Sequence, residues 1–249
     1  MLNLLIDNNI NVSSSNIRHG FGLFETIRIR YGVPLYLDAH IKRLASGTRF
    51  LGMEAPPSWE EVLEFLIVST DCFAMKSGAL RLLAIDSNLY VTILSCEPNY
   101  PKTIVVGLSN IVTRFSRDIF TRFKTISYID NKVMALEAER RGLYEVIALN
   151  ENNDVTDGSR TNVFLVINGQ LVTPRMVDGA LPGIIRGILL NAKLASEARV
   201  TVADLGNAEA MMLTNALHKI TPVHTFYWCK EHTLDATHPL IMSAISLIT

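Results

Sequence analysis

VTDGSRTNVF, at residues 155–164, is the most informative stretch of this chain. Its acidic residue and glycine, Asp157 and Gly158, follow a polar run and precede an apolar strand, so a carboxylate lies at a turn between strands. Lys124 lies upstream, at the end of a polar loop and just before a predicted helix. Downstream, LPGIIR at residues 181–186 begins another predicted helix. A lysine, a carboxylate and a glycine-led helix start therefore follow one another along the chain.

The sequence after Lys124 predicts alternating helices and strands. Apolar periodicity indicates a helix over 130–141 and a strand over 145–149. Residues 162–167 and 170–173 are expected to form a hairpin around Asn168-Gly169, a strong turn signal. The remaining expected elements are a helix over 183–198, strands over 209–213 and 221–226, and a helix packed on the core over 239–248.

The first half of the chain predicts a second set of elements. Ser58 and Glu61 have the spacing of a capping box at the start of a helix that runs to about residue 73. Asp38 is expected to cap a helix ending near residue 51. The expected strands cover residues 2–6, 24–30, 35–37, 79–85, 90–95 and 103–108.

These patterns predict an α+β protein of two domains with mixed, mainly antiparallel sheets. Residues 110–123 lose the apolar period and gain charged residues, which indicates a linker. The predicted division is a small N-terminal α/β domain over 1–113, a linker over 114–122 and a larger C-terminal domain over 123–249.

Composition excludes several classes of partner. The chain has 249 residues, 49% of them hydrophobic, and a formal net charge of −1. Without a basic excess it is not expected to bind nucleic acid or an acidic membrane. The cysteines Cys72, Cys96 and Cys229 form no CxxC pair and are interpreted as buried, reduced thiols. No signal peptide is predicted and the longest apolar run is too short to span a bilayer, so a cytoplasmic location is expected.

Lys124, Asp157 and the start of the predicted helix at Gly183 are the residues that carry chemistry. A lysine nucleophile must lose its proton near neutral pH, and Phe123, Ile126 and Arg122 provide apolar cover and a nearby cation. Taken one at a time, each also has an ordinary interpretation: a solvated loop lysine, a turn aspartate and a plain loop before a helix. Together they supply what a protein needs to hold pyridoxal phosphate (PLP): an amine, a carboxylate for the ring nitrogen and N–H groups for the phosphate.

Several other residues leave alternatives open. Arg43 either clamps a phosphate or lies solvated beside Lys42. Thr214-Asn215-Ala216 either presents a hydroxyl and N–H groups at a strand end or caps a helix. His19 and His40 have no partner at metal-ligand spacing, so no metal site is predicted.

The combination resembles the class IV PLP-dependent enzymes (fold type IV). This family includes branched-chain aminotransferases, D-amino acid aminotransferases and aminodeoxychorismate lyases. GLFETIR at 22–28 resembles the family's early strand motif, HIKRL at 40–44 its arginine-bearing helix, and KTISY at 124–128 its catalytic lysine and tyrosine. The family signature continues from Asp157 through Asn162, Val163, Phe164, Leu171, Thr173, Leu181, Gly183, Ile184 and Arg186.

The resemblance implies a role for each matching position. Lys124 is implied to be the catalytic residue that bonds to PLP. Tyr128 is implied to lie near the ring, and Asp157 to face its nitrogen. The phosphate contacts implied by position are Arg43, the helix start at Gly183, Ile184 and Ile185, and the strand end at Thr214 and Asn215.

Two positions depart from the family pattern. Asp157 is one methylene shorter than the usual glutamate, which weakens the electron sink unless the strand lies closer or a water intervenes. Ile185 stands where many members have threonine, so one hydroxyl contact to the phosphate is replaced by a backbone contact alone.

The resemblance leaves three functions to be compared. Thr214-Asn215-Ala216-Leu217 is more similar to the lyases, and favours a 4-amino-4-deoxychorismate lyase of folate biosynthesis that gives 4-aminobenzoate and pyruvate. The alternatives are a D-amino acid or branched-chain aminotransferase, a transferase, and a PLP-binding protein without turnover. Residues 86–89 replace the loop that many relatives use near the substrate carboxylate. The candidate substrate-binding residues are Phe24, Arg28, Arg81, Arg160 and His218.

The resemblance also implies the partners. It implies a small-molecule amino substrate and a homodimer, in which each active site is completed near the subunit interface.

Overall fold

The structure is a computed structural model that describes residues 1–6, 10–11, 13–71, 74–95, 101 and 103–248. The chain divides into two compact units. Unit 1 contains Met1–Asn99 and Phe123–Tyr128, and unit 2 contains Tyr100–Arg122 and Ile129–Thr249. The mixed content of helices and mainly antiparallel strands agrees with the predicted α+β class.

This division differs from the boundaries predicted from the sequence. Strand β6 (Val105–Arg114) pairs with two strands of unit 2, so the chain enters unit 2 well before residue 113. The segment that carries Lys124 belongs to unit 1, because Leu23 bridges Thr125 and the Phe24 N–H donates to the Lys124 carbonyl at 2.9 Å. The predicted linker contains a short 3-10 helix, η2 (Ile119–Arg122). The spacing of apolar residues along the chain does not show which distant segments pair. The boundaries predicted from that spacing therefore differ from this division.

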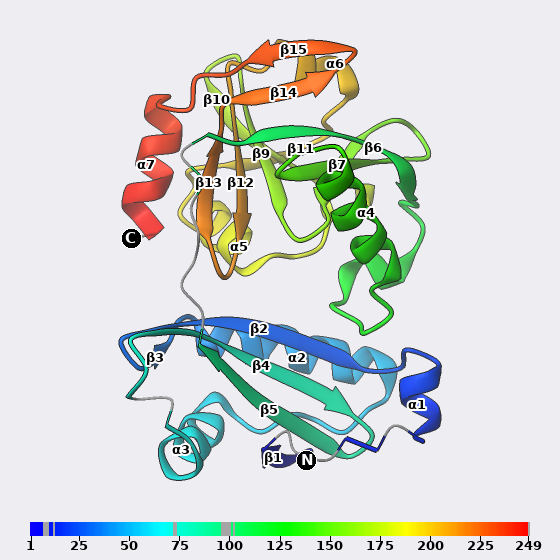
Figure 1. Cartoon of the computed structure of the whole chain (residues 1–249), viewed down its shortest axis with the longest axis vertical. Helices are drawn as coiled ribbons and strands as arrows, with labels where there is room; N and C mark the ends of the chain where they lie inside the picture. Colours follow the sequence, from blue (N-terminus) through cyan, green and yellow to red (C-terminus); the bar gives the residue numbers. More distant parts are fainter. Residues whose placement is uncertain (7–9, 12, 72–73, 96–100, 102, 249) are drawn as a thin grey trace. The chain divides into compact units, whose positions relative to one another are not determined.

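In the described part of the chain, unit 1 is built on a five-stranded sheet, drawn in blue to teal in Figure 1. Its strands pair antiparallel except for the first, which lies parallel to its neighbour. The predicted hairpin over 79–85 and 90–95 is confirmed, with both strands slightly longer. In spatial order the strands are β1 (Asn3–Ile6), β5 (Asn88–Ser95), β4 (Ser77–Ile85), β2 (Leu23–Arg30) and β3 (Val33–Pro34).

Two helices supply much of the remaining core of unit 1. Helix α2 (Leu37–Leu51) packs against β2, where Leu23, Ile27 and Ile29 alternate toward it. Helix α3 (Trp59–Ser69) begins with the predicted Ser58–Glu61 capping box, which is confirmed. It ends before the predicted residue 73, which lies outside the described residues. A short α1 (Ser15–Arg18) precedes β2.

The expected strand over 35–37 is wrong. Tyr36 has φ of 57°, in the left-handed region, and helix α2 begins at the next residue. That backbone turn directs the chain from β3 straight into the helix, so no second long strand forms.

Within the described residues, unit 2 contains a ten-stranded sheet. The predicted hairpin at Asn168-Gly169 is confirmed and joins β9 to β10. Its strands, with β12 and β13 branching from β9, are β6, β7 (Glu145–Asn150), β8 (Val155–Gly158), β9 (Asn162–Ile167), β10 (Gln170–Pro174), β11 (Ser196–Ala198), β12 (Ala210–Asn215), β13 (Lys219–Val223), β14 (Thr225–Trp228) and β15 (Lys230–Thr233).

Four helices flank this sheet. Helix α4 (Ile129–Arg140) packs on β6 and β7, and α5 (Ile184–Asn191) packs on β12. Helix α6 (Val202–Asn207) packs on β9, and α7 (Pro239–Ile248) lies beside β13, in red in Figure 1. None of the helices in the described part of the chain has the length and apolarity that a bilayer crossing requires.

Three expectations for unit 2 need correction. The helix predicted over 183–198 ends at Asn191, and β11 follows it in parallel with β10. The strand predicted over 221–226 is two strands, β13 and β14, which pair with different neighbours. Cys229 is exposed rather than buried, while Cys72 and Cys96 lie outside the described residues.

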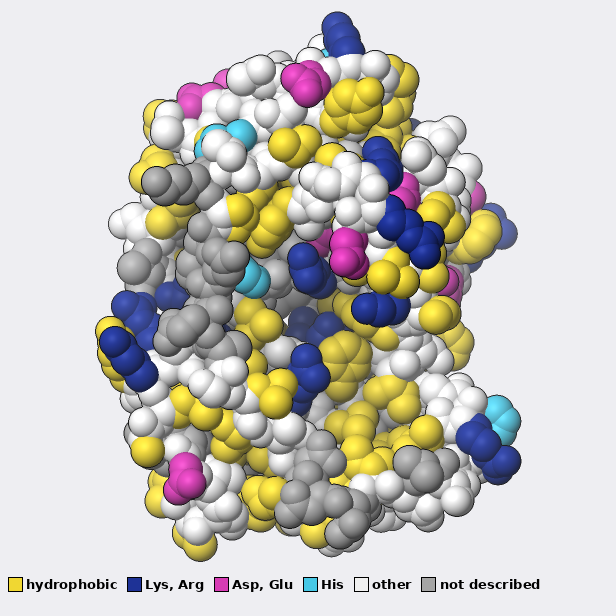
Figure 2. Space-filling view, in the orientation of Figure 1, with side chains coloured by type: hydrophobic (Ala, Val, Ile, Leu, Met, Phe, Trp, Pro, Cys, Tyr) yellow, Lys and Arg dark blue, Asp and Glu magenta, His cyan; other side chains and the backbone are white. Residues whose placement is uncertain are grey.

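Hydrophobic side chains also reach the surface of both units, as Figure 2 shows in yellow. Ile67 and Val68 are 59% and 79% exposed on α3 of unit 1. Phe115 and Phe120 are 60% and 52% exposed in unit 2.

Candidate functional site

Lys124 lies beside two aromatic rings in unit 1. Its Nζ is 4.2 Å from the centroid of the Phe24 ring and 4.7 Å from that of Tyr128, and it donates to the Tyr128 hydroxyl at 3.4 Å. The two rings meet edge to face at 5.1 Å. The side chain is therefore half-buried and held in one place, unlike that of a solvated loop lysine.

Gly22 lets the lysine segment approach β2. A Cβ at this position would meet the Ala84 carbonyl oxygen at 2.9 Å and the Ile126 side chain at 3.0 Å. The Ile126 N–H donates to the Gly22 carbonyl at 3.0 Å. The glycine of the GLFETIR motif thus has a steric reason to be there.

Three of the candidate substrate residues share one face of the sheet in unit 1. Phe24 and Arg28 alternate on β2, and Arg81 of β4 is paired with Thr26, which lies between them. This is the face that carries the Lys124 amine. Arg81 is exposed, whereas Arg28 is 9% exposed and donates to the Ser77 hydroxyl at 2.6 Å.

The opposite face of β2 carries a buried cluster formed by Glu25, His40 and Arg43. Arg43 donates from Nε and Nη2 to the two carboxylate oxygens of Glu25, at 2.8 and 2.6 Å. His40 Nδ1 lies 2.6 Å from Glu25 Oε2. Both Glu25 and His40 are almost fully buried.

The charges in this cluster follow from its geometry. Burial alone would raise the pKa of Glu25, but the charge and hydrogen bonds of Arg43, and then those of His40, lower it from 4.5 to about 2. Burial lowers the pKa of His40, and the charges of Arg43 and Lys124 add to this effect against the hydrogen bond with Glu25. Glu25 is therefore ionised and His40 neutral near pH 7.

Asp157 lies on β8 of unit 2 and is 6% exposed. The Leu181 N–H donates to its Oδ2 at 3.1 Å, and Arg114 Nε lies 3.4 Å from its Oδ1. The backbone contact joins the carboxylate to the segment that leads into α5. Asp157 is thus bonded to the segment that enters α5 and is not only a turn residue.

The start of α5 has the features of an anion site. Gly183 is the N-cap and supplies no side-chain cap, and the first intrahelical bond is donated by Gly187. The N–H groups of Ile184 and Ile185 therefore have no acceptor within the helix. On the neighbouring β12, the Thr214 hydroxyl is buried with no hydrogen-bond partner among the described residues.

Asn215 holds the turn that follows β12. Its side-chain oxygen accepts from the N–H groups of Leu217 and His218 at 3.0 and 2.7 Å. These bonds fix the turn between β12 and β13, so the structure gives the Asn215 oxygen a structural role. His218, a candidate substrate residue, is half-buried in that turn.

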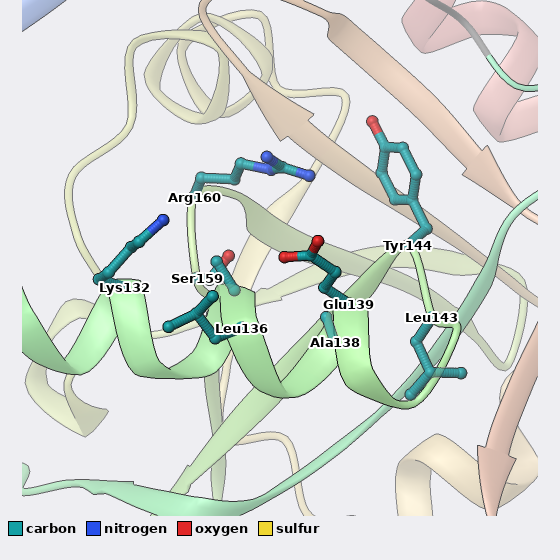
Figure 3. A pocket seen from close by; sticks show the side chains of 9 residues that line it. Lys132, Leu136, Ala138, Glu139, Leu143, Tyr144, Ser159 and Arg160 are labelled. Atoms are coloured by element: carbon teal, nitrogen blue, oxygen red, sulfur yellow. The ribbon is translucent and has the colours of Figure 1, made fainter.

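Arg160 lines a surface pocket of about 410 Å³ in unit 2, drawn in Figure 3. Lys132 and Glu139 of α4 line the same pocket. The Arg160 guanidinium is 5.9 Å from the centre of the Tyr144 ring. The residues that line this pocket include neither Asp157 nor a residue of α5.

Sequence reasoning missed a buried carboxylate that holds the turn after Asp157. Glu145 is 1% exposed and accepts from the N–H groups of Ser159 and Arg160 and from the Thr161 hydroxyl, at 3.1 to 3.3 Å. Burial raises the pKa of Glu145, and these donors act against that rise. The sequence around Glu145 gives no sign of this role, because the residue stands at the start of an ordinary strand.

Glu25 was also missed, although the sequence held a signal. It occupies a position in β2 where the alternation of Leu23 and Ile27 calls for an apolar side chain. A carboxylate at such a position needs a buried partner, and Arg43 and His40 are the partners.

Comparison with protein families gives one match over most of the chain. The family model described as "Amino-transferase class IV" matches residues 22–226. The match includes Lys124, Asp157 and the start of α5.

Individual relatives differ in the activities that their names state. An aminodeoxychorismate lyase of Bacillus subtilis is 27% identical over 225 residues, covering 82% of this chain and 77% of the relative. A branched-chain-amino-acid aminotransferase of Salmonella typhimurium is 24% identical over 251 residues, covering 88% and 80%. Among solved structures, a "Putative 4-amino-4-deoxychorismate lyase" of Legionella pneumophila superposes with a TM-score of 0.87 at 24% identity, covering 99% of this chain and 97% of the other.

Proposed function

This chain belongs to the class IV aminotransferase family, and we propose that it is a 4-amino-4-deoxychorismate lyase that releases 4-aminobenzoate and pyruvate. Enzymes of this family depend on PLP, and the fold is that of the type IV enzymes. Lyases and aminotransferases both occur among the relatives. The observation that carries the proposal is the Lys124 amine, held against Phe24 and 3.4 Å from the Tyr128 hydroxyl.

The described residues fit PLP in their chemistry. A buried Thr214 hydroxyl without a described partner and an uncapped start of α5 suit a phosphate group. Asp157 supplies a carboxylate for the ring nitrogen, and Lys124 supplies the amine. We assign Arg43 to the phosphate and Tyr128 to the ring.

PLP, when bound, withdraws electrons from the substrate carbon that bears the amine. Lys124 Nζ then takes the proton from that carbon, because it is the amine that the site holds in place. The Phe24 and Tyr128 rings keep Nζ in one orientation and shield it from water. Release of pyruvate leaves an aromatic product, so the reaction is strongly downhill and tolerates the shorter carboxylate of Asp157.

Arg81 is the candidate that the geometry favours for the substrate carboxylate. It shares the sheet face of the Lys124 amine and is exposed, so its guanidinium is accessible to a ligand. Arg28 shares the face but donates to Ser77 in a buried position.

The lyase is favoured over an aminotransferase by the turn after β12. Thr214-Asn215-Ala216-Leu217 is more similar to the lyase pattern, and the Asn215 oxygen organises that turn. An aminotransferase uses the same lysine but needs a pocket that accepts two substrates in turn.

The proposal is tested with purified protein, PLP and aminodeoxychorismate. We expect pyruvate and 4-aminobenzoate to appear together in equal amounts. Lys124→Ala is expected to lower the rate by several orders of magnitude. Lys230→Ala, on the exposed edge strand β15, is the control and should keep the activity. Product formation that survives Lys124→Ala would contradict the proposal.

A second assay separates the alternatives. D-alanine, D-glutamate or a branched-chain amino acid is added without a keto acid, and the cofactor spectrum is followed. Stoichiometric conversion of PLP to its amine form would identify an aminotransferase. PLP that binds without either reaction would identify a binding protein without turnover.

The assembly is a further part of the proposal. We expect a homodimer, with a mass in sedimentation equilibrium of twice 27.7 kDa. A subunit interface would bury some of the exposed hydrophobic side chains of the two units.

A further inference from the structure

Two adjacent residues of β2, Phe24 and Glu25, contact two different basic side chains of unit 1. The Phe24 ring contacts the Lys124 amine at 4.2 Å on one face of the sheet. The next residue, Glu25, points to the other face and binds Arg43 of α2. The backbone of a single strand therefore fixes the two cations relative to each other.

Glu25 binds Arg43 in a way that fixes its orientation. Two hydrogen bonds, donated by Arg43 Nε and Nη2 to the two carboxylate oxygens, restrain the plane of the guanidinium as well as its position. The Arg43 side chain is 13% exposed and that of Glu25 is 1% exposed. Without the carboxylate, the long arginine side chain would turn toward water to recover the hydration of its charge.

His40 completes the support of Glu25. It lies one helical turn before Arg43 on α2 and bonds to the same carboxylate at 2.6 Å. Because His40 is neutral, it adds a hydrogen bond without adding charge.

Glu25 has two opposing effects on a phosphate. Its negative charge offsets the charge of Arg43 and by itself weakens anion binding. Its hydrogen bonds hold the guanidinium in a fixed plane, which favours a ligand that needs oriented donors. The burial of the cluster and the paired bonds indicate that orientation dominates.

We propose that Glu25 is a positioning residue for the phosphate of PLP, which acts through Arg43 and is supported by His40. This rests on the proposed function, since it takes Arg43 as a phosphate ligand. Glu25 itself does not touch the cofactor. Replacing Glu25 should weaken the contribution of the phosphate to PLP affinity and leave the contribution of the aldehyde-bearing ring unchanged.

The test compares two ligands of the full-length protein: PLP and pyridoxal, which lacks the phosphate. Dissociation constants are measured by absorbance on protein stripped of cofactor. We expect Glu25→Gln to weaken PLP binding by about tenfold and to change pyridoxal binding by less than about twofold. Arg43→Met should do the same, and adding Glu25→Gln to Arg43→Met should cause no further loss.

Two further variants keep the test decisive. Glu137→Gln is the matched control, because Glu137 is 4% exposed and paired with Arg141 at 2.7 Å in unit 2. Glu137→Gln should lower the unfolding temperature and leave the ratio of the PLP and pyridoxal affinities unchanged. If Glu25→Gln does not fold, Glu25→Asp replaces it in the test. This variant keeps the negative charge but moves the carboxylate one methylene away from Arg43. It should weaken PLP binding selectively, to a smaller degree than expected for Glu25→Gln.

The outcomes separate this inference from the proposed function. If Glu25→Gln tightens PLP binding, or weakens PLP and pyridoxal equally, Glu25 is not a positioning residue. The proposed function is tested by the wild-type protein alone. If borohydride fails to fix PLP onto Lys124 of the wild type, it is the proposed function that fails.

Discussion

Arg28 and Arg81 are two arginines of one sheet that differ in their surroundings. Both lie on the same sheet face, but Arg28 donates to Ser77 in a buried position while Arg81 is exposed. A buried guanidinium already bonded to a hydroxyl is suited to holding the sheet together. An exposed one on the face of Lys124 is suited to binding a substrate carboxylate.

Replacing Arg81 should therefore affect the substrate and not the cofactor. Arg81→Gln is expected to lower kcat/KM about 10- to 100-fold, chiefly through KM, because one charge-assisted hydrogen bond to a carboxylate is lost. The affinity for PLP should stay unchanged. Arg49→Gln, at an exposed site on the last turn of α2, is the control. A wild-type KM in Arg81→Gln would place the carboxylate elsewhere.

His40 should make the stability of the protein depend on pH. Its pKa is lowered from 6.5 in the folded state, so below pH 6.5 the unfolded chain binds the proton more readily. The free energy of unfolding should then fall as the pH falls below 6.5, by at most about 1.4 kcal/mol per pH unit. Above pH 6.5 this contribution is fully present.

Urea unfolding of wild type and His40→Gln at pH 7.5 and 5.5 checks this expectation. The stability difference between them should be larger at pH 7.5, because the variant has no imidazole to titrate. His19→Gln, at an exposed position on the C-cap of α1, is the control. An equal difference at both pH values would count against a neutral, buried His40.

Two elements, β2 and α5, each fix part of the candidate site. Strand β2 places Phe24 and Glu25 on opposite faces, a direct result of strand geometry. Gly183 is the N-cap of helix α5, and a Cβ there would overlap the side-chain oxygen of Asn162. The Asn162 amide in turn donates to the Leu181 carbonyl at 2.8 Å, which fixes the chain as it enters the helix.

The two glycines of this segment should respond in opposite directions to alanine. Gly183→Ala is expected to cost roughly 1–3 kcal/mol, because Asn162 must move and lose its bond to Leu181. Gly187→Ala has no atom within 4 Å of the new Cβ and lies inside α5, so it should stabilise by roughly 0.5–1 kcal/mol. Urea denaturation of the two variants measures both effects. Equal stabilities would show that the entry to α5 is not tightly packed.

At the scale of the whole molecule, each unit has its own hydrophobic core. The core of unit 1 lies between its sheet and helices α2 and α3, and that of unit 2 includes β9, β12 and Phe226. The candidate residues are drawn from both units: Lys124 and Arg43 from unit 1, Asp157 from unit 2. A ligand that binds only the folded chain stabilises it by mass action.

Removing PLP should therefore lower the unfolding temperature. At a PLP concentration about 100 times its dissociation constant, the expected stabilisation is about 2.7 kcal/mol. For a chain of this size that corresponds to a shift of roughly 5–10 °C. Differential scanning fluorimetry of stripped and PLP-saturated protein measures it, with Lys124→Ala expected to show a much smaller shift. An unchanged midpoint in the wild type would contradict PLP as a ligand of the folded state.

Elements whose signals lie in neighbouring residues could be predicted before the fold was known. The capping box at Ser58, the hairpin at Asn168-Gly169 and the helix over 239–248 depend on neighbouring residues, and all three were predicted. The family motifs around Lys124 and Asp157 are likewise written in short runs of sequence. Their matching to the class IV family followed from those runs.

The pairing of distant segments could be learned only from the folded chain. The tertiary structure moved the lysine segment into unit 1 through its bridge to Leu23, and it gave residues 105–114 to unit 2. It also joined Glu25 to Arg43 and His40, a contact between a strand and the helix that follows it. Local propensity reports what a residue prefers for itself, whereas strand pairing and buried ion pairs depend on which partner the folded chain brings within a few ångströms.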